Sequence, residues 1–150
     1  LVDGRGVILA ADPNAEFAGI CQGKQIGKIL NDSANIIGIY KERLYLYGTP
    51  WCSPEAVQAE RAPLGGIVFL KKSDAGAVTD LPEDKRQLLM LVHCKSPFWR
   101  EGLLDQCLNT IQRVEPSVWI RQLESHADEA AADVLKPALD TIENDTVAEY

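Results

Sequence analysis

The spacing of apolar positions divides the chain into a strand-rich first half and a helix-rich second half. Short runs of β-branched, aliphatic and aromatic residues predict strands in the first half, at 6–10, 28–30, 35–40, 43–47, 65–70 and, as an edge strand, 77–79. Only Lys41 and Glu42 separate the run at 35–40 from the run at 43–47, so we expect these two to form a β-hairpin. The segment 53–62 is polar and predicts a loop or a short helix.

The first predicted helix runs from Pro82 to Val92. Its first turn is acidic, and four apolar residues are expected to face inward: Leu88, Leu89, Leu91 and Val92. His93 follows on the same apolar face, and we expect it to be a packed core histidine.

A second helix is predicted after Ser96 and Pro97, which fit an N-cap and the first helical position. One face of this helix carries apolar residues at i, i+3, i+4 and i+7, namely Leu104, Cys107, Leu108 and Ile111. Pro116 is expected to end the helix, and the run 118–123 predicts another strand.

The last predicted helix is rich in alanine. Ser125 and Asp128 resemble a capping box with Asp in place of Glu, and Pro137 is expected to kink or end the helix. The acidic segment 140–150 is expected to be a frayed tail. The order of elements therefore predicts one α/β domain over residues 1–139, with a mixed, largely antiparallel sheet flanked by helices.

Composition and charge narrow the classes of partner. The 150 residues are 46% hydrophobic and 25% charged, which is typical of a globular domain. The formal net charge of −7 argues against nucleic acid or an anionic membrane as a partner, because phosphate contacts need a basic face. No apolar run approaches the ~20 residues of a membrane helix. The opening residues Leu1 to Gly4 contain no signal-like apolar stretch, and four cysteines without a C-x-x-C pair predict reduced thiols in a cytoplasmic protein.

The cysteines give no metal or redox signature. Cys21, Cys52, Cys94 and Cys107 form no C-x-x-C pair, so we expect reduced, mostly buried thiols. His93 and Cys94 could form half of a metal site, but only His126 remains to complete it, and His126 is expected to be exposed. We expect no bound metal from these residues.

Several short strings occur in an order that resembles a known family. They are Asp3–Leu9, Ile29–Asp32, Gly48–Trp51, Ala62–Leu64 with Ile67–Leu70, Pro97–Trp99 and Val114–Val118. Together they resemble the HPr-kinase-like family, whose domain shares its fold with phosphoenolpyruvate carboxykinases, and the resemblance covers roughly Asp3 to Leu135. It implies a single domain of the HPr kinase C-terminal type, in which a strand at 6–10 leads into a phosphate-binding loop.

The loop at that place departs from the family pattern. A phosphate loop needs glycines, a lysine and a Ser or Thr that holds the metal. The corresponding residues here are Asp12, Pro13, Asn14, Ala15, Glu16, Phe17, Ala18 and Gly19. Glu16 would repel a phosphate at ~4 Å by on the order of 4 kcal/mol per charge pair at a surface-like dielectric. We therefore predict a degenerate loop that holds no nucleotide.

A second frame, Ala18 to Gln25, has the length of such a loop and contains Lys24. The strand predicted at Lys28 follows too closely to leave room for the helix whose N-terminus binds phosphate. Lys24 and Lys28 are expected to be solvated charges near a turn.

Asp32 is the candidate for any retained catalytic or metal-binding chemistry. Relatives present two adjacent acidic residues here, whereas this chain has Asp32 followed by Ser33. A carboxylate at a strand end can bind Mg²⁺ with help from substrate phosphates. The competing interpretation is a turn rich in Asx hydrogen bonds. At Cys52 relatives often have histidine.

The remaining candidates have structural interpretations. Trp51 could stack on a ligand but is expected to plug the core edge, and Trp99 and Trp119 are expected in the core. Arg61 and Arg100 could contact phosphate but are expected to make surface salt bridges.

Two functions therefore stay open. The first is a non-catalytic kinase-fold module that needs no cofactor and binds a protein or peptide partner, with a homo-oligomer as a further possibility. The alternative is an ATP- and Mg²⁺-dependent kinase of serine or a small molecule, with an atypical phosphate loop.

Overall fold

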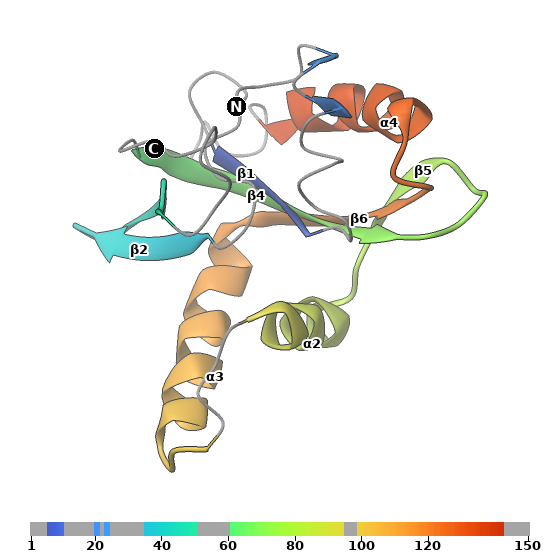
Figure 1. The fold of residues 1–150 in the computed structure, drawn as a ribbon. Helices are drawn as coiled ribbons and strands as arrows, with labels where there is room; N and C mark the ends of the chain where they lie inside the picture. The colour runs from blue at the N-terminus through green and yellow to red at the C-terminus, as the bar shows by residue number, and fades with distance from the viewer. Residues whose placement is uncertain are drawn as a thin grey trace.

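The computed structural model describes residues 6–10, 20–21, 23–24, 35–50, 61–94 and 99–142, and the following account concerns these residues. In chain order the elements are β1 (Gly6–Ala10), β2 (Ile36–Tyr40), β3 (Arg43–Tyr47), β4 (Arg61–Lys71), β5 (Ala77–Asp80), α2 (Glu83–His93), α3 (Leu103–Val114), the 3-10 turn η2 (Glu115–Ser117), β6 (Trp119–Glu124) and α4 (Glu129–Asp140). Figure 1 shows the sheet between α4 on one face and α2 and α3 on the other.

The sheet is mixed, as the sequence predicts. Its strand order is β2-β3-β4-β6-β5, and β1 pairs with β4. The pairs β1–β4 and β4–β6 are parallel, whereas β2–β3, β3–β4 and β5–β6 are antiparallel. Because Gly66 to Phe69 pair with both β1 and β6, these two strands lie on opposite edges of β4. The α/β class with a mostly antiparallel sheet flanked by helices is confirmed.

Alternation along β4 builds two cores. Val68 is buried on the α4 face, with Trp119, Leu123, Leu135 and Ile142. Ile67 and Phe69 point to the opposite face, where they pack with Val114 and Ile120. Successive side chains of a strand point to opposite faces, so a continuous apolar strand serves helices on both sides. The result is a three-layer α/β/α arrangement.

The predicted hairpin is confirmed. Tyr40 pairs with Arg43, and Ile36 pairs with Tyr47. Lys41 and Glu42 have φ angles of 50° and 64°, as a two-residue turn with the twist of a hairpin requires. Neither residue is a glycine, so a positive φ costs conformational energy at both positions. Pairing of the two strands compensates for this cost.

Two element boundaries differ from the prediction, and a third agrees with it. β4 begins at Arg61, because the segment before the apolar run pairs with β3, Pro63 opposite Tyr45. α3 begins at Leu103 after Gly102, which has a φ of 84°, and not at Ser96 and Pro97. α3 ends at Val114, in agreement with the expected stop near Pro116.

The α4 helix corrects two further expectations. Its N-cap is Asp128, whose carboxylate accepts a hydrogen bond from the Ala131 N–H at 3.0 Å, so Ser125 and Asp128 form no capping box. Pro137 lies inside the helix, which continues to Asp140. Packing of the helix on the sheet offsets the hydrogen bond that a proline removes. Ile142 is fully buried, so packing reaches into the segment expected to be a tail.

The prediction of core residues on α2 and in the following turn is wrong in part. Leu88 and Val92 are 58% and 68% exposed, and Trp99 is 87% exposed, whereas Trp119 is buried as expected. His93 is also exposed, although its ring packs 5.2 Å from the ring of Phe69. Within the described ranges, no helix has the length and apolar character needed to cross a membrane.

Candidate functional site

The residues predicted for a nucleotide or metal site, Asp12 to Gly19 and Asp32, lie outside the described residues. The same holds for Lys28, Trp51 and Cys52. The strand expected to precede the loop is confirmed, since β1 pairs in parallel with β4 from Gly6 to Ala10.

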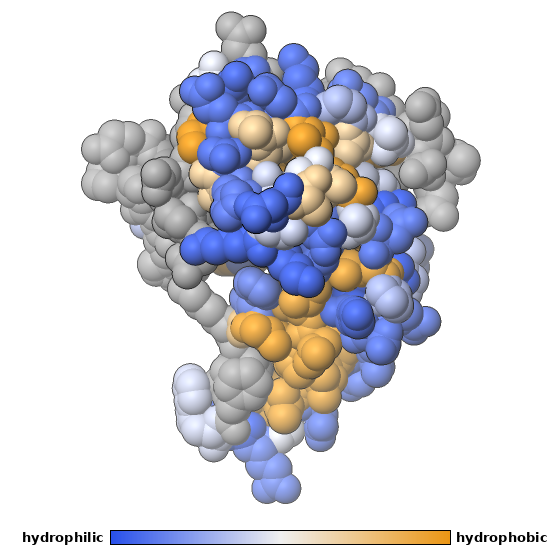
Figure 2. Space-filling view, turned by 90° about the vertical axis from the view of Figure 1, so that its right-hand side faces the viewer, coloured by the Kyte–Doolittle hydropathy of each residue, from blue (hydrophilic) through white to orange (hydrophobic). Residues whose placement is uncertain are grey.

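The carboxyl ends of the parallel strands β1, β4 and β6 meet at one edge of the sheet, at the right of Figure 1. Ligands of α/β proteins commonly bind at such an edge. The described side chains there pair with one another: Lys71 forms an ion pair with Glu124 at 3.8 Å, and His126 Nε2 lies within hydrogen-bond distance of Asp74 Oδ1, at 2.7 Å. Figure 2 views this side of the molecule and shows a hydrophilic band across its middle.

The described part of this edge holds no metal-ligand set. Among the described residues no three His, Cys, Asp or Glu side chains gather as metal ligands would. His126 is exposed, as predicted, and it pairs with Asp74 rather than with Cys94. The half-site suggested by His93 and Cys94 is therefore not completed by His126.

Lys24 is engaged by α4. Its ammonium lies 3.6 Å from Glu129 and 3.5 Å from Asp133, and its side chain is 35% exposed, so Lys24 is a partly exposed charge at a turn that pairs with two carboxylates. The Lys24 N–H donates to the Ile20 carbonyl at 3.0 Å, which is a helical bond. The second phosphate-loop frame would need an open loop at Ile20 and Cys21, but both are helical. Two carboxylates already balance the one lysine that this frame offers.

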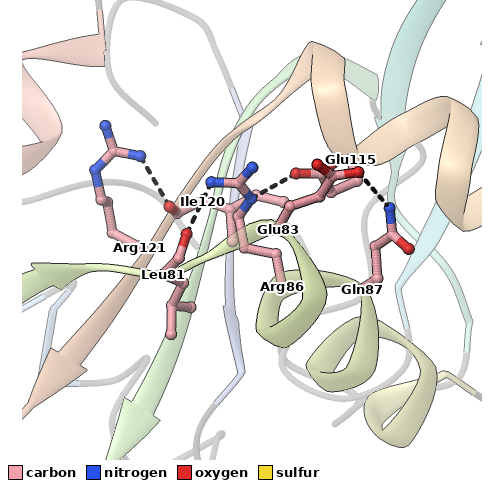
Figure 3. Close-up of polar contacts among 7 residues, drawn as sticks. All are labelled: Leu81, Glu83, Arg86, Gln87, Glu115, Ile120 and Arg121. Carbon is pink, nitrogen blue, oxygen red and sulfur yellow. Dashed lines mark hydrogen bonds and ion pairs between the residues drawn. The ribbon is translucent and has the colours of Figure 1, made fainter.

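A buried ion pair holds α2 in place (Figure 3). Glu115 is 3% exposed, and its carboxylate accepts a hydrogen bond from Arg86 Nε at 2.5 Å. The Arg86 guanidinium also donates to the Leu81 carbonyl at 2.8 Å. Sequence reasoning missed this pair because its partners lie 29 positions apart and neither belongs to a recognisable motif.

The α2 helix is held with little apolar burial. Its sequence contains the consecutive apolar residues Leu88 to Val92, yet none of its residues is fully buried. Leu89 and Met90 pack partly against the core beneath the sheet, while Leu88 and Val92, one turn apart, face outward. Figure 2 shows a hydrophobic patch on the lower half of the molecule, where Figure 1 places α2 and α3. We call the surface of Leu88 and Val92 the α2 face.

Two thiols lie in contact where the end of α2 meets α3. The sulfur atoms of Cys94 and Cys107 lie 3.3 Å apart, and both residues are partly exposed rather than buried. Burial, followed by the hydrogen bond with Cys107, raises the pKa of the Cys94 thiol to about 11. Cys21 is buried as expected, and burial raises its pKa to about 11. The sequence shows both cysteines within apolar helical patterns, but it does not show that Cys94 and Cys107 lie next to each other.

The two arginines considered as phosphate contacts lie in different surroundings. The Arg61 guanidinium lies over the rings of Tyr45, at 4.7 Å, and Tyr40, at 5.6 Å. Arg100 is exposed in the turn before α3. Arg61 therefore braces the β2–β3 hairpin through cation–π contacts.

We found no match to this chain among protein-family models, curated proteins or solved structures. The fold defines its class as an α/β protein with a mixed sheet between helices.

Proposed function

We propose that this chain is a non-catalytic module of the kinase-like fold that its motifs resemble, and that it binds a partner protein through the α2 face. The observation that carries the proposal is the apolar run Leu88 to Val92, on a helix in which no residue is fully buried.

The exposed apolar groups favour a helical partner. Full burial of a Leu or Val side chain contributes about 1.5–3 kcal/mol. Leu88 and Val92 lie one turn apart and present a short apolar stripe. Such a stripe suits an amphipathic helix that lays its own apolar side on it.

The net charge of the chain favours a partner of opposite, positive charge. The chain carries a net charge of −7, and carboxylates precede and follow the α2 face along the chain: Glu83, Asp84, Glu101 and Asp105. Four basic residues lie in the same stretch, Lys85, Arg86, Lys95 and Arg100, so the charges there balance and the preference rests on the net charge of the whole chain. A partner helix with basic residues beside its apolar side is therefore favoured over a second copy of this acidic chain.

Two features support the loss of nucleotide binding. The loop residues Asp12 to Gly19 contain no lysine and two carboxylates, Asp12 and Glu16. Lys24, the next lysine along the chain, pairs with Glu129 and Asp133 of α4. A phosphate would have to compete with both carboxylates for this ammonium group.

A labelled amphipathic peptide of leucine and lysine tests the docking proposal by fluorescence anisotropy. We expect saturable binding, and we expect Leu88→Gln with Val92→Gln to weaken it by about tenfold, roughly 1.4 kcal/mol. The matched control is Ile39→Gln on β2, because Ile39 is 43% exposed and lies away from α2. This control should bind as the unaltered protein does.

Two results would contradict the docking proposal. Equal weakening by Ile39→Gln, or equal binding of a scrambled peptide of the same composition, would mean that the α2 face has no specific role. A dimer that sedimentation detects and that Leu88→Gln dissolves would assign the α2 face to a second copy of the chain.

A titration with Mg²⁺ and ATP tests the absence of catalysis. Ligand binding to the native state raises the melting temperature by mass action, so we expect no shift. A rise of several degrees, with phosphate transfer that Asp32→Asn abolishes, would instead support the kinase alternative.

A further inference from the structure

The one close pair of reactive groups in the described part of the chain that the proposed function does not use is Cys94 with Cys107. Their sulfur atoms are 3.3 Å apart, and a disulfide requires about 2 Å. Both residues are partly exposed, so a small molecule can reach them.

The backbone around Cys94 allows the remaining approach. Cys94 is the C-cap of α2 and has an extended conformation, with φ −81° and ψ 135°. It can therefore shift by about 1 Å without unwinding the helix, while Cys107 stays fixed within α3.

We infer that Cys94 and Cys107 form a reversible oxidation site, in which a small disulfide such as oxidised glutathione converts the two thiols into one intramolecular disulfide. Burial raises the pKa of the Cys94 thiol and so disfavours its thiolate. Cys107 therefore attacks first: as a thiolate it attacks a sulfur of the oxidant, forms a mixed disulfide and releases one thiolate of the oxidant. The other cysteine gives up its thiol proton, attacks the protein sulfur of the mixed disulfide and releases the second thiolate. Two electrons and two protons pass to the oxidant, which leaves as two thiols.

The disulfide would link Cys94, at the end of α2, covalently to α3. The bond closes a ring from Cys94 to Cys107 and fixes the end of α2 on α3. An effect on peptide binding at the α2 face rests on the proposed function, whereas formation of the disulfide does not.

Peptide mapping by mass spectrometry tests the oxidation site. The intact protein is equilibrated with reduced and oxidised glutathione, free thiols are blocked by alkylation, and the digest is analysed. We expect a cross-linked peptide joining Cys94 and Cys107, loss of two hydrogen atoms and recovery of both thiols after reduction. Cys94→Ser and Cys107→Ser should each stop at the glutathione adduct, whereas Cys21→Ser should still form the disulfide.

The readout separates this inference from the docking proposal. Alkylation of both Cys94 and Cys107 under oxidising conditions, or a disulfide from either to another cysteine, would overturn the oxidation site whatever the peptide does. A mapped Cys94–Cys107 disulfide supports it even if the leucine–lysine peptide fails to bind.

Discussion

At the residue scale, Gly66 shows how closely the core between the sheet and α4 is packed. A Cβ atom at this position would lie 3.0 Å from Trp119 Cε3, 3.1 Å from Ile142 Cδ1 and 3.2 Å from the Trp119 carbonyl oxygen. One of these neighbours is backbone, so the site has little room to relax.

Gly66→Ala is therefore expected to lower the free energy of unfolding by about 1–3 kcal/mol, the usual cost of overpacking. Urea denaturation followed by circular dichroism measures the change. Gly23→Ala is the matched control, since nothing lies within 4 Å of its added Cβ. A neutral Gly66→Ala would show that Trp119 moves freely.

The buried thiol of Cys21 makes stability depend on alkaline pH. Burial raises the Cys21 pKa from 9.0 to about 11 in the folded protein. The folded state then binds the proton more tightly than the unfolded state, so this contribution is complete below pH 9 and is lost as the pH rises towards 11.

We expect the stability difference between the unaltered protein and Cys21→Ala to shrink between pH 9 and pH 11. The limiting slope is about 1.4 kcal/mol per pH unit. Denaturation at a series of pH values measures it, and parallel stability curves would mean that Cys21 is solvated in the folded protein.

At the scale of elements, α2 is attached through polar bonds together with partial apolar contacts. Arg86 reaches the buried carboxylate of Glu115 and the carbonyl of Leu81, while Leu89 and Met90 give partial apolar contact. A helix held in this way can keep Leu88 and Val92 on its outer side without losing its position.

Arg86→Met should lower the free energy of unfolding by about 3 kcal/mol, because it leaves the carboxylate of Glu115 buried and unpaired. Arg86→Met combined with Glu115→Leu should recover most of the loss, since no buried charge remains. Thermal denaturation of the single and double variants measures both effects. A double variant as unstable as the single one would assign the loss to packing of the arginine stem.

At the scale of the whole molecule, the helices α4 and α2 differ in how far they are buried against the sheet. The α4 side buries Leu135, Leu139 and Ile142 almost completely, whereas α2 on the other side has no fully buried residue. That other side still has its own core, to which α3 contributes Val114, so we expect global stability to depend on both cores and recognition to depend on the exposed residues of α2.

Leu135→Ala should destabilise the protein by about 2–5 kcal/mol, as deletion of a buried leucine does. Leu88→Ala should stay within about 0.5 kcal/mol of the unaltered protein, because the side chain is 58% exposed. Chemical denaturation compares the two. A large loss for Leu88→Ala would mean that the α2 face is covered by this chain or by a second copy.

Local pattern alone determined much of the fold. The β2–β3 hairpin, the amphipathic face of α3 and the strand β6 were predicted because strand and helix periods are carried by neighbouring residues. The starts of β4 and α3 were not predicted. The start of β4 depends on pairing with β3, and the start of α3 depends on the turn at Gly102, and neither feature belongs to the apolar pattern of its element. The predicted site at Asp12 to Gly19 and Asp32 stays a prediction, because it lies outside the described residues.

Tertiary structure alone decided which apolar residues are covered. Both α2 and α4 carry several apolar residues, but one helix leaves Leu88 and Val92 exposed while the other buries Leu135 and Leu139. The Arg86–Glu115 ion pair and the Cys94–Cys107 contact likewise join positions far apart in the chain. Amphipathic spacing states which side of a helix is apolar, and only the packing of other elements fixes whether this chain or a partner covers that side.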